Sequence, residues 1–263
     1  MAPEPTTLAP TVVVDGLTAR YGEETVLAGV SFDVFPGERF LILGESGCGK
    51  STLLKNMLGL EEPAAGQVTI EGVEIVGAPA EELARLRLRL GVLFQSGALF
   101  GSMTLFDNVA MPLREHTSLP ETVIRDIVRM KLGMVELSGF DNHYPAELSG
   151  GMHKRAGIAR AMAMDPEILF LDEPSAALDP VTAAELDRLI EAINEDMGTT
   201  MVIVTQDLSS VLEIGSRCIV IGKRERGIIA KGDPRRLKED ADDERVRGFF
   251  NRRPPGPADT ARR

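Results

Sequence analysis

Residues 44–52 form a glycine-rich segment that restricts the folds open to this chain. The segment reads Gly-Glu-Ser-Gly-Cys-Gly-Lys-Ser-Thr, after the apolar run 40–43 and before the helix-like run 53–58. A strand, loop and helix of this kind is typical of a phosphate-binding loop, where glycines let backbone N–H groups converge on one anion. Lys50 is then placed to reach the β- and γ-phosphates, and Ser51 to ligate Mg²⁺. The expected nucleotide-binding residues are Gly44, Glu45, Ser46, Gly47, Cys48, Gly49, Lys50, Ser51 and Thr52.

Net charge and cysteine content narrow the possible partners and the compartment. The formal net charge of −11 argues against a duplex-binding surface, which needs clustered Lys and Arg, so we expect no nucleic-acid partner. Only Cys48 and Cys218 occur, which suggests no disulfide framework and fits a reducing cytoplasm. No run approaches the 18 or more apolar residues of a membrane span, so any membrane role is expected to be peripheral.

Two groups of predicted strands indicate an α/β fold. Alternating residues at 11–14 and 30–34 predict a small antiparallel sheet that leads into the buried run 40–43. Wholly apolar runs at 168–171, 201–204 and 218–221 predict strands covered on both faces. A helical pattern from Val181 to Met197, closed by Gly198, lies between the first two of these runs and implies a βαβ crossover.

The chain is expected to be one domain spanning residues 11–250. Residues 96–165 lack a comparable strand run, and Val123, Ile127, Met130 and Met134 recur at helical spacing, which predicts an inserted helical region. The Pro- and Thr-rich residues 1–10 and the Pro-rich residues 251–263 are expected to be flexible.

Two further segments carry charge or free backbone donors. Asp172 and Glu173 follow the strand 168–171, where α/β sheets present ligands; we expect Asp172 to bind Mg²⁺ and Glu173 to polarise the attacking water. Ser149, Gly150 and Gly151 precede a helix expected to begin near His153, and a helix N-terminus is a potential second anion site. Taken alone, these residues also fit an ordinary Ser-capped helix.

The order of these motifs resembles the ATP-binding cassette (ABC) ATPases. The phosphate loop is followed by Gln95, by Leu-Ser-Gly-Gly at 148–151, by Leu-Asp-Glu-Pro at 171–174 and by Ala-Leu-Asp at 177–179. The resemblance covers residues from about 11 to 250. It implies an α/β fold with a RecA-like P-loop core, an antiparallel β subdomain and an inserted α-helical subdomain, in which two copies sandwich two ATP molecules.

The same resemblance implies individual roles. Ser149, Gly150 and Gly151 would contact the γ-phosphate held by a second copy, and Asp179 would face that copy. Gln95 would sense Mg²⁺ and the lytic water. Tyr21 lies where family members stack an aromatic ring on adenine, although a core position is an alternative.

One position departs from the family pattern. Family members usually place a histidine after the strand that follows the acidic pair, whereas this chain has Gln206 there. Its amide can donate a hydrogen bond to the γ-phosphate but cannot carry a proton. We therefore predict retained ATP binding and slower hydrolysis, with adequate substitution by glutamine as the alternative.

Three segments resemble the ATPase subunits of Mla and Mce-type lipid transporters. They are Phe-Gln-Ser-Gly-Ala-Leu-Phe at 94–100, Pro-Leu-Arg-Glu-His-Thr at 112–117, and the Leu-Ser-Gly-Gly-Met segment followed, after one intervening residue, by Lys154 and Arg155. The likeness also reaches residues 245–250, Arg-Val-Arg-Gly-Phe-Phe. The likeness implies an ATP-hydrolysing motor on the cytoplasmic face of the inner membrane. Its implied partners are a permease, an Mce-domain lipid-binding protein and a small STAS-domain protein, and its implied substrate is phospholipid or another hydrophobic molecule.

Two other classes share the nucleotide motifs. One is a soluble ABC ATPase unconnected with lipid transport. The other is an ATP-gated regulatory subunit that barely hydrolyses, which only Gln206 suggests.

Overall fold

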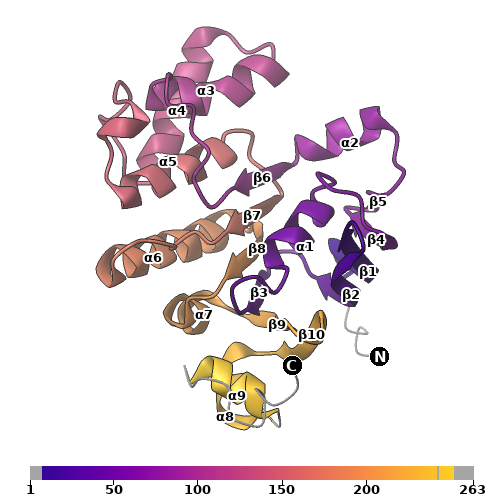
Figure 1. The fold of residues 1–263 in the computed structure, drawn as a ribbon. Helices are drawn as coiled ribbons and strands as arrows, with labels where there is room; N and C mark the ends of the chain where they lie inside the picture. The colour runs from indigo at the N-terminus through magenta and orange to yellow at the C-terminus, as the bar shows by residue number, and fades with distance from the viewer. Residues whose placement is uncertain (1–7, 242, 252–263) are drawn as a thin grey trace, which may run out of the picture.

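The computed structural model describes residues 8–241 and 243–251. The predictions of flexibility for residues 1–10 and 251–263 therefore fall mostly outside the described residues. Within them, a central sheet carries an antiparallel sheet on one side and a group of helices on the other, as Figure 1 shows.

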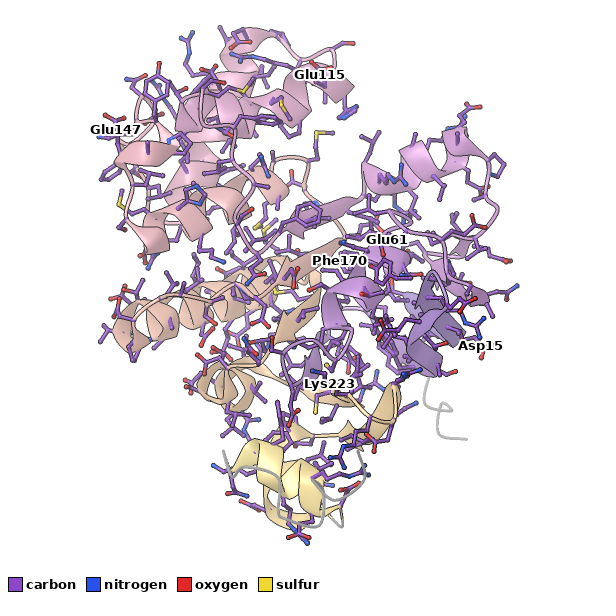
Figure 2. All side chains as sticks on the ribbon, viewed as in Figure 1. Asp15, Glu61, Glu115, Glu147, Phe170 and Lys223 are labelled. Carbon is purple, nitrogen blue, oxygen red and sulfur yellow. The ribbon has the colours of Figure 1, made fainter. Side chains whose placement is uncertain are left out.

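The central sheet contains six strands in the order β10-β9-β3-β8-β7-β6. Its strands are β3 (Arg39–Gly44), β6 (Leu90–Leu93), β7 (Ile168–Asp172), β8 (Thr200–Thr205), β9 (Arg217–Gly222) and β10 (Gly227–Gly232). All neighbours are parallel except β9 and β10. Every residue of β7 and β8 is buried, because helices and the second sheet cover both faces. Figure 2 shows Phe170 of β7 near the centre of the molecule.

The predicted βαβ crossover is confirmed. Strand β7 leads through α6 (Pro180–Met197) into β8, which pairs with β7 in parallel. Gly198 ends α6 with a left-handed φ of 66°, a conformation that glycine adopts without a Cβ clash. This connection places the residues after β7 and β8 at the same edge of the sheet, where the phosphate loop also lies.

The predicted antiparallel sheet is also confirmed, with strand order β2-β1-β4-β5. Its strands are β1 (Val12–Tyr21), β2 (Glu24–Val34), β4 (Ala65–Ile70) and β5 (Val73–Glu74), and the short helix α2 (Ala80–Arg87) follows. Phe32 of β2 stacks on Phe40 of β3 with ring centroids 5.1 Å apart. The core between the two sheets therefore fixes the position of β3 and of the loop that follows it.

Between β6 and β7 the described chain is helical. It contains α3 (Leu105–His116), α4 (Glu121–Met134), the single turn η1 (Pro145–Glu147) and α5 (Gly150–Ala161). The periodic positions used for the prediction do lie in a helix, α4, although Val123 and Met130 are exposed while Ile124 and Val128 are buried. Lys131 is buried on that face through its ion pair with Asp165, which a search for apolar periodicity does not detect.

Three more helices follow β8 in the described residues: α7 (Leu208–Ile214), α8 (Pro234–Asp240) and α9 (Glu244–Phe250). Helices α8 and α9 lie below the central sheet in Figure 1, and Val246 and Phe250 of α9 pack into the main hydrophobic core. The end of the chain's described part is thus held by apolar contacts.

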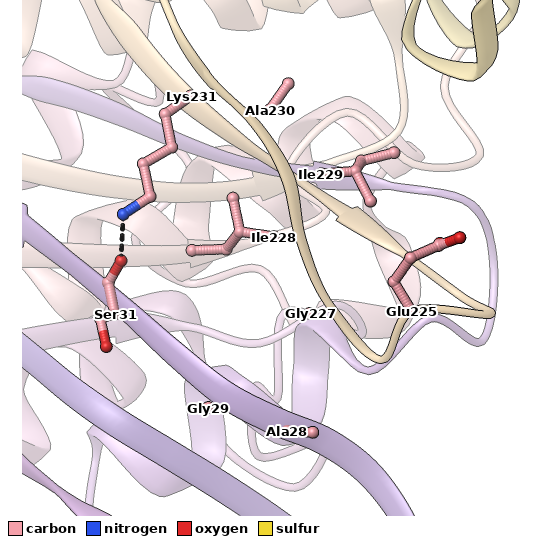
Figure 3. Close-up of a pocket in the computed structure, with 9 residues that line it drawn as sticks. All are labelled: Ala28, Gly29, Ser31, Glu225, Gly227, Ile228, Ile229, Ala230 and Lys231. Carbon is pink, nitrogen blue, oxygen red and sulfur yellow. Dashed lines mark hydrogen bonds between the residues drawn. The ribbon is translucent and has the colours of Figure 1, made fainter. Parts of the chain in front are cut away.

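One outer strand of the antiparallel sheet, β2, and one of the central sheet, β10, lie side by side. The Ala28 N–H donates to the Arg226 carbonyl at 2.7 Å, and the Lys231 ammonium donates to the Ser31 carbonyl. Figure 3 shows the groove of about 530 Å³ that remains along this junction. It is lined by Ala28, Gly29, Ser31, Glu225, Gly227, Ile228, Ile229, Ala230 and Lys231. None of the predicted nucleotide-binding residues lines it, so we place the candidate site elsewhere.

Helix α6 carries a buried carboxyl group whose hydrogen bonds do not fully replace its lost hydration. Asp187 is 3% exposed, and its Oδ1 has no hydrogen-bond partner. Burial raises its pKa from 3.8 to about 6, a shift that Ser210 opposes and the nearby Asp207 and Glu213 increase. The folded state therefore favours the protonated carboxyl, and stability falls as the pH rises from about 4 to 6.

Asp187→Asn is expected to raise the free energy of unfolding at pH 8 by roughly 3 kcal/mol, the equivalent of this pKa shift. The gain should shrink as the pH falls below 6 and vanish only below about 3, where the aspartate is neutral in both states. Urea unfolding across this range measures it, and Asp196→Asn on the exposed side of α6 is the control. A gain that does not change with pH would contradict this assignment.

Candidate functional site

The phosphate loop connects β3 to α1 (Lys50–Met57), as the sequence predicts. Gly44 and Gly49 have φ values of 152° and 104°, both in the region that glycine favours. A Cβ on Gly44 would lie 2.6 Å from the Ile221 carbonyl oxygen, and one on Gly49 would lie 2.8 Å from Leu27 Cδ2. The loop is therefore packed closely against β9 and β2, and glycine is required at both positions.

The side chains of the loop divide between its two sides. Lys50 is 6% exposed and donates to the carbonyls of Gly44 and Glu45 at 2.9 and 3.2 Å, so its ammonium lies inside the loop. Cys48 packs beneath the loop at 2% exposure, and burial raises the pKa of its thiol. Cys48 is therefore a packing residue, whereas Lys50 is available to a phosphate group.

A pocket of about 250 Å³ lies over the loop. It is lined by Val26, Ser46, Gly47, Gly49, Lys50, Ser51, Thr52, Gln95, Glu173 and Gln206. The fold thus brings together the ends of β3, β6, β7 and β8, which are far apart in the sequence. Val26 is the lining residue that sequence reasoning missed, since an aliphatic residue in a strand gives no chemical signal.

The acidic pair ends β7 beside this pocket. The Ser51 hydroxyl lies 3.5 Å from Asp172 Oδ1, and Lys50 Nζ lies 3.8 Å from Glu173 Oε1. Burial raises the pKa of both carboxyl groups, against the opposing effects of Ser51 and Lys50 on Asp172 and of Lys50 on Glu173. A raised pKa suits a carboxylate that accepts a proton during hydrolysis. The hydroxyl and carboxylate oxygens of Ser51 and Asp172 are the ligand types that Mg²⁺ prefers.

Glu173 has an unusual backbone conformation. Its φ is 49°, in the left-handed region that non-glycine residues rarely adopt. Its N–H donates to the Val204 carbonyl at 2.8 Å, which ties it to the end of β8. Strained residues of this kind persist where surrounding contacts hold them, often at functional sites.

Gln95 and Gln206 enter the pocket from the ends of β6 and β8. Both residues are exposed within the pocket region, so a bound nucleotide and water can reach their amides. The main-chain amide of Gln206 also lowers the pKa of Glu173, although burial outweighs this effect. The structure thus places the residue at the usual histidine position beside the expected base.

Tyr21 is not a core residue, because it is 50% exposed at the end of β1. Its hydroxyl donates to Glu61 Oε2 at 2.6 Å and lies 3.5 Å from the Thr52 hydroxyl. Glu61 in turn pairs with Lys55 of α1 at 3.0 Å. The ring is therefore next to the phosphate loop and accessible, as adenine stacking requires.

The Leu-Ser-Gly-Gly segment lies apart from the pocket. Helix α5 begins at Gly150, three residues before the predicted start, and Ser149 caps it by accepting from the Met152 N–H at 3.3 Å. Ser149 and Gly150 are exposed, whereas Gly151 is buried against Thr182. A Cβ on Gly151 would lie 2.4 Å from Thr182 Cγ2, so only glycine fits there. None of these residues lines the pocket that contains Lys50.

Asp179 caps α6 and also lies outside the pocket. Its carboxylate accepts from the N–H groups of Val181 and Thr182, each at 3.1 Å, and from the Thr182 hydroxyl at 2.6 Å. The Thr182 hydroxyl is the main reason that the pKa of Asp179 is lowered. Since Thr182 also lies against Gly151, Asp179 and the Leu-Ser-Gly-Gly segment lie close together.

Comparison with known proteins agrees with this geometry. The ABC transporter family model matches residues 27–176. The chain is 44% identical to the probable ribonucleotide transport ATP-binding protein mkl of Mycobacterium leprae, over 94% of this chain and 70% of that protein. It is 40% identical to the intermembrane phospholipid transport system ATP-binding protein MlaF of Haemophilus influenzae, over 94% of this chain and 92% of that protein.

A solved structure shares the fold. The dimeric, post-hydrolysis structure of the ATP-binding cassette MJ0796 bound to ADP and Pi superposes with a TM-score of 0.77 at 32% identity. The match covers 84% of this chain and 98% of that one.

Proposed function

This chain belongs to the ABC transporter ATPase family, and from that membership we propose that it drives phospholipid transport as half of an ATP-sandwich dimer. It is an ATP-binding ATPase and the motor subunit of a transporter. The lipid substrate, the composite site and the roles of individual residues are the proposed part.

The proposed chemistry uses the pocket residues in distinct roles. Lys50 and the loop N–H groups bind the β- and γ-phosphates, and Glu173 accepts the proton of the attacking water. Gln95 and Gln206 orient the water and the γ-phosphate through their amides. Ser51 and Asp172 would hold Mg²⁺, which neutralises charge on the phosphates when bound. The raised pKa of Glu173 supports its role as the base.

The exposure of Ser149 away from Lys50 carries the dimer proposal. Ser149 opens α5, where free N–H groups and the helix dipole favour an anion, yet the pocket of the same chain does not include it. A second copy, related by twofold symmetry, would bring its Ser149 to this pocket and complete the site. ATP binding would then close the dimer.

A membrane permease is the proposed target of this closure. Across residues 8–241 and 243–251, no helix has the length and apolar character needed to cross a bilayer. We propose that the chain binds the permease on the cytoplasmic face of the inner membrane, together with an Mce-domain lipid-binding protein and a STAS-domain protein. Copurification of tagged chain with these partners tests the assembly.

The substrate class is phospholipid in this proposal. The coverage of 92% of MlaF and the three segments that resemble lipid-transport ATPases favour it. The ribonucleotide named for the mkl protein is the competing substrate. Reconstitution with the permease in liposomes containing labelled phospholipid should give ATP-dependent lipid transfer. Transfer of labelled ribonucleotide in place of lipid would overturn the lipid assignment.

Replacing Gln206 with histidine is expected to raise the ATPase kcat by up to about tenfold, equivalent to about 1.4 kcal/mol on the barrier. The imidazole can donate a hydrogen bond to the γ-phosphate and also carry positive charge, which the amide cannot. Steady-state ATPase assays at saturating ATP measure this change. Gln206→Asn is the control, since it keeps an amide but shortens its reach. An unchanged kcat in the histidine variant would show that glutamine serves equally well.

A further inference from the structure

Lys154 is a buried cation that the proposed chemistry does not use. It lies on α5, four residues after Gly150, and is 7% exposed. An ammonium group is costly to remove from water, so one that is buried must have strong partners. The positions of those partners indicate what the residue does.

The Lys154 ammonium bridges two strand ends beside the nucleotide pocket. It donates to the Gln95 carbonyl at 2.6 Å and to the Glu173 carbonyl at 3.0 Å. Both acceptors are main-chain groups of residues whose side chains line the pocket. One side chain from the helical region therefore holds the backbone at the ends of β6 and β7, and charge strengthens both hydrogen bonds.

The hydrogen bond from Lys154 reaches a residue with a strained backbone. Glu173 has a φ of 49°, and its N–H donates to the Val204 carbonyl. Lys154 fixes the carbonyl on the other side of the same residue. The two bonds together define the direction in which the Glu173 side chain leaves the backbone.

Local charge supports an ammonium at this place. Burial lowers the pKa of Lys154, while the negative charges of Asp172 and Glu173 oppose that effect. Lys131 provides a contrast, because it is also buried in the helical region but pairs with Asp165. Lys154 thus differs from an ordinary buried lysine in what it contacts.

We propose that Lys154 is a positioning residue that couples the placement of α5 to the geometry of Gln95 and Glu173. Ser149 caps the same helix. In the closed dimer, a γ-phosphate held by the second copy and bound at the start of α5 would therefore act through Lys154 on the nucleotide site of the chain that carries this lysine. This inference rests on the proposed roles of Glu173 and Ser149. It assigns to one lysine the link between the two nucleotide sites.

The first test compares Lys154→Met with Lys154→Arg in the full chain. Methionine has a similar length but no donors, and misplacement of the base should lower the ATPase kcat by about 10- to 100-fold. The KM and the Kd for ATP should change by less than about twofold, because Lys154 does not touch the phosphate loop. Arginine keeps several donors and should restore kcat to within about fivefold of the original chain.

The matched control is Lys131→Met, which removes another buried lysine of the helical region. It should leave kcat unchanged, even if it lowers the melting temperature. A fall in kcat for Lys154→Met that arginine does not relieve, or that occurs equally in Lys131→Met, would overturn the positioning role.

Hydrogen exchange provides a readout that does not depend on turnover. In Lys154→Met without nucleotide, the amides at 95–98 and 173–177 should exchange about tenfold faster, while those of β8 stay protected. Unchanged exchange in both segments would overturn this inference. If Glu173→Gln leaves turnover intact, the proposed function fails instead, and the exchange result separates the two failures.

Discussion

Replacing Glu173 with glutamine is expected to lower the ATPase kcat by about 100-fold or more, the usual contribution of a general base. The amide keeps the size of the side chain but cannot accept the proton of the attacking water. It also removes the carboxylate that lies 3.8 Å from Lys50, so ATP should bind at least as tightly as before. The variant should therefore accumulate as an ATP-bound dimer.

Phosphate release and size-exclusion chromatography with Mg²⁺ and ATP measure both effects. Glu115→Gln is the control, because Glu115 is exposed at the outer end of the helical region in Figure 2. Equal turnover in the Glu173 variant and the original chain would rule out Glu173 as the base. Equal but negligible turnover in both would identify the chain as a regulatory subunit that binds ATP without hydrolysing it.

Mixing two inactive variants is expected to restore hydrolysis. Lys50→Ala removes the phosphate-binding ammonium, and Ser149→Arg places a bulky cation at the exposed start of α5. Each homodimer has two defective sites. A mixed dimer should have one site with both defects and one with neither, because each site of the proposed dimer takes Lys50 from one chain and Ser149 from the other.

An equal mixture should give about a quarter of the original ATPase rate if sites turn over independently, since half of the dimers are mixed and each has one intact site. The two variants alone, assayed at the same total concentration, are the controls. Loss of the Ser149 cap costs about 1 kcal/mol, so circular dichroism should show a folded chain. No recovery on mixing, with mixed dimers demonstrated by differential tagging, would contradict a composite site.

The sequence predicted the parts of the fold that local patterns specify. Uniform apolar runs identified β7, β8 and β9, and the periodic run closed by Gly198 identified α6. Strand β6 was missed because it has only four residues, of which Gly91 is one. Helix α4 was predicted as a helix, but apolar spacing alone does not identify its buried face, which includes Lys131.

The site was predictable only in part, because some of its contacts involve main-chain atoms and not side chains. Glycine spacing and the acidic pair identify Lys50, Asp172 and Glu173 as chemical groups, and the pocket or its immediate neighbourhood contains all three. The role of Lys154 depends on two main-chain carbonyls that are 59 and 19 residues away along the chain. Every residue has a main-chain carbonyl, so a contact with that group does not require a particular residue type. No sequence motif therefore reveals such a contact.

The junction between β2 and β10 has a further consequence for the free chain. An outer strand presents unpaired N–H and C=O groups that can recruit strands from other molecules. Here the bonds from Ala28 to Arg226 and from Lys231 to Ser31 turn the two outer strands towards each other. Each strand therefore hinders a foreign strand from pairing with the other along this junction.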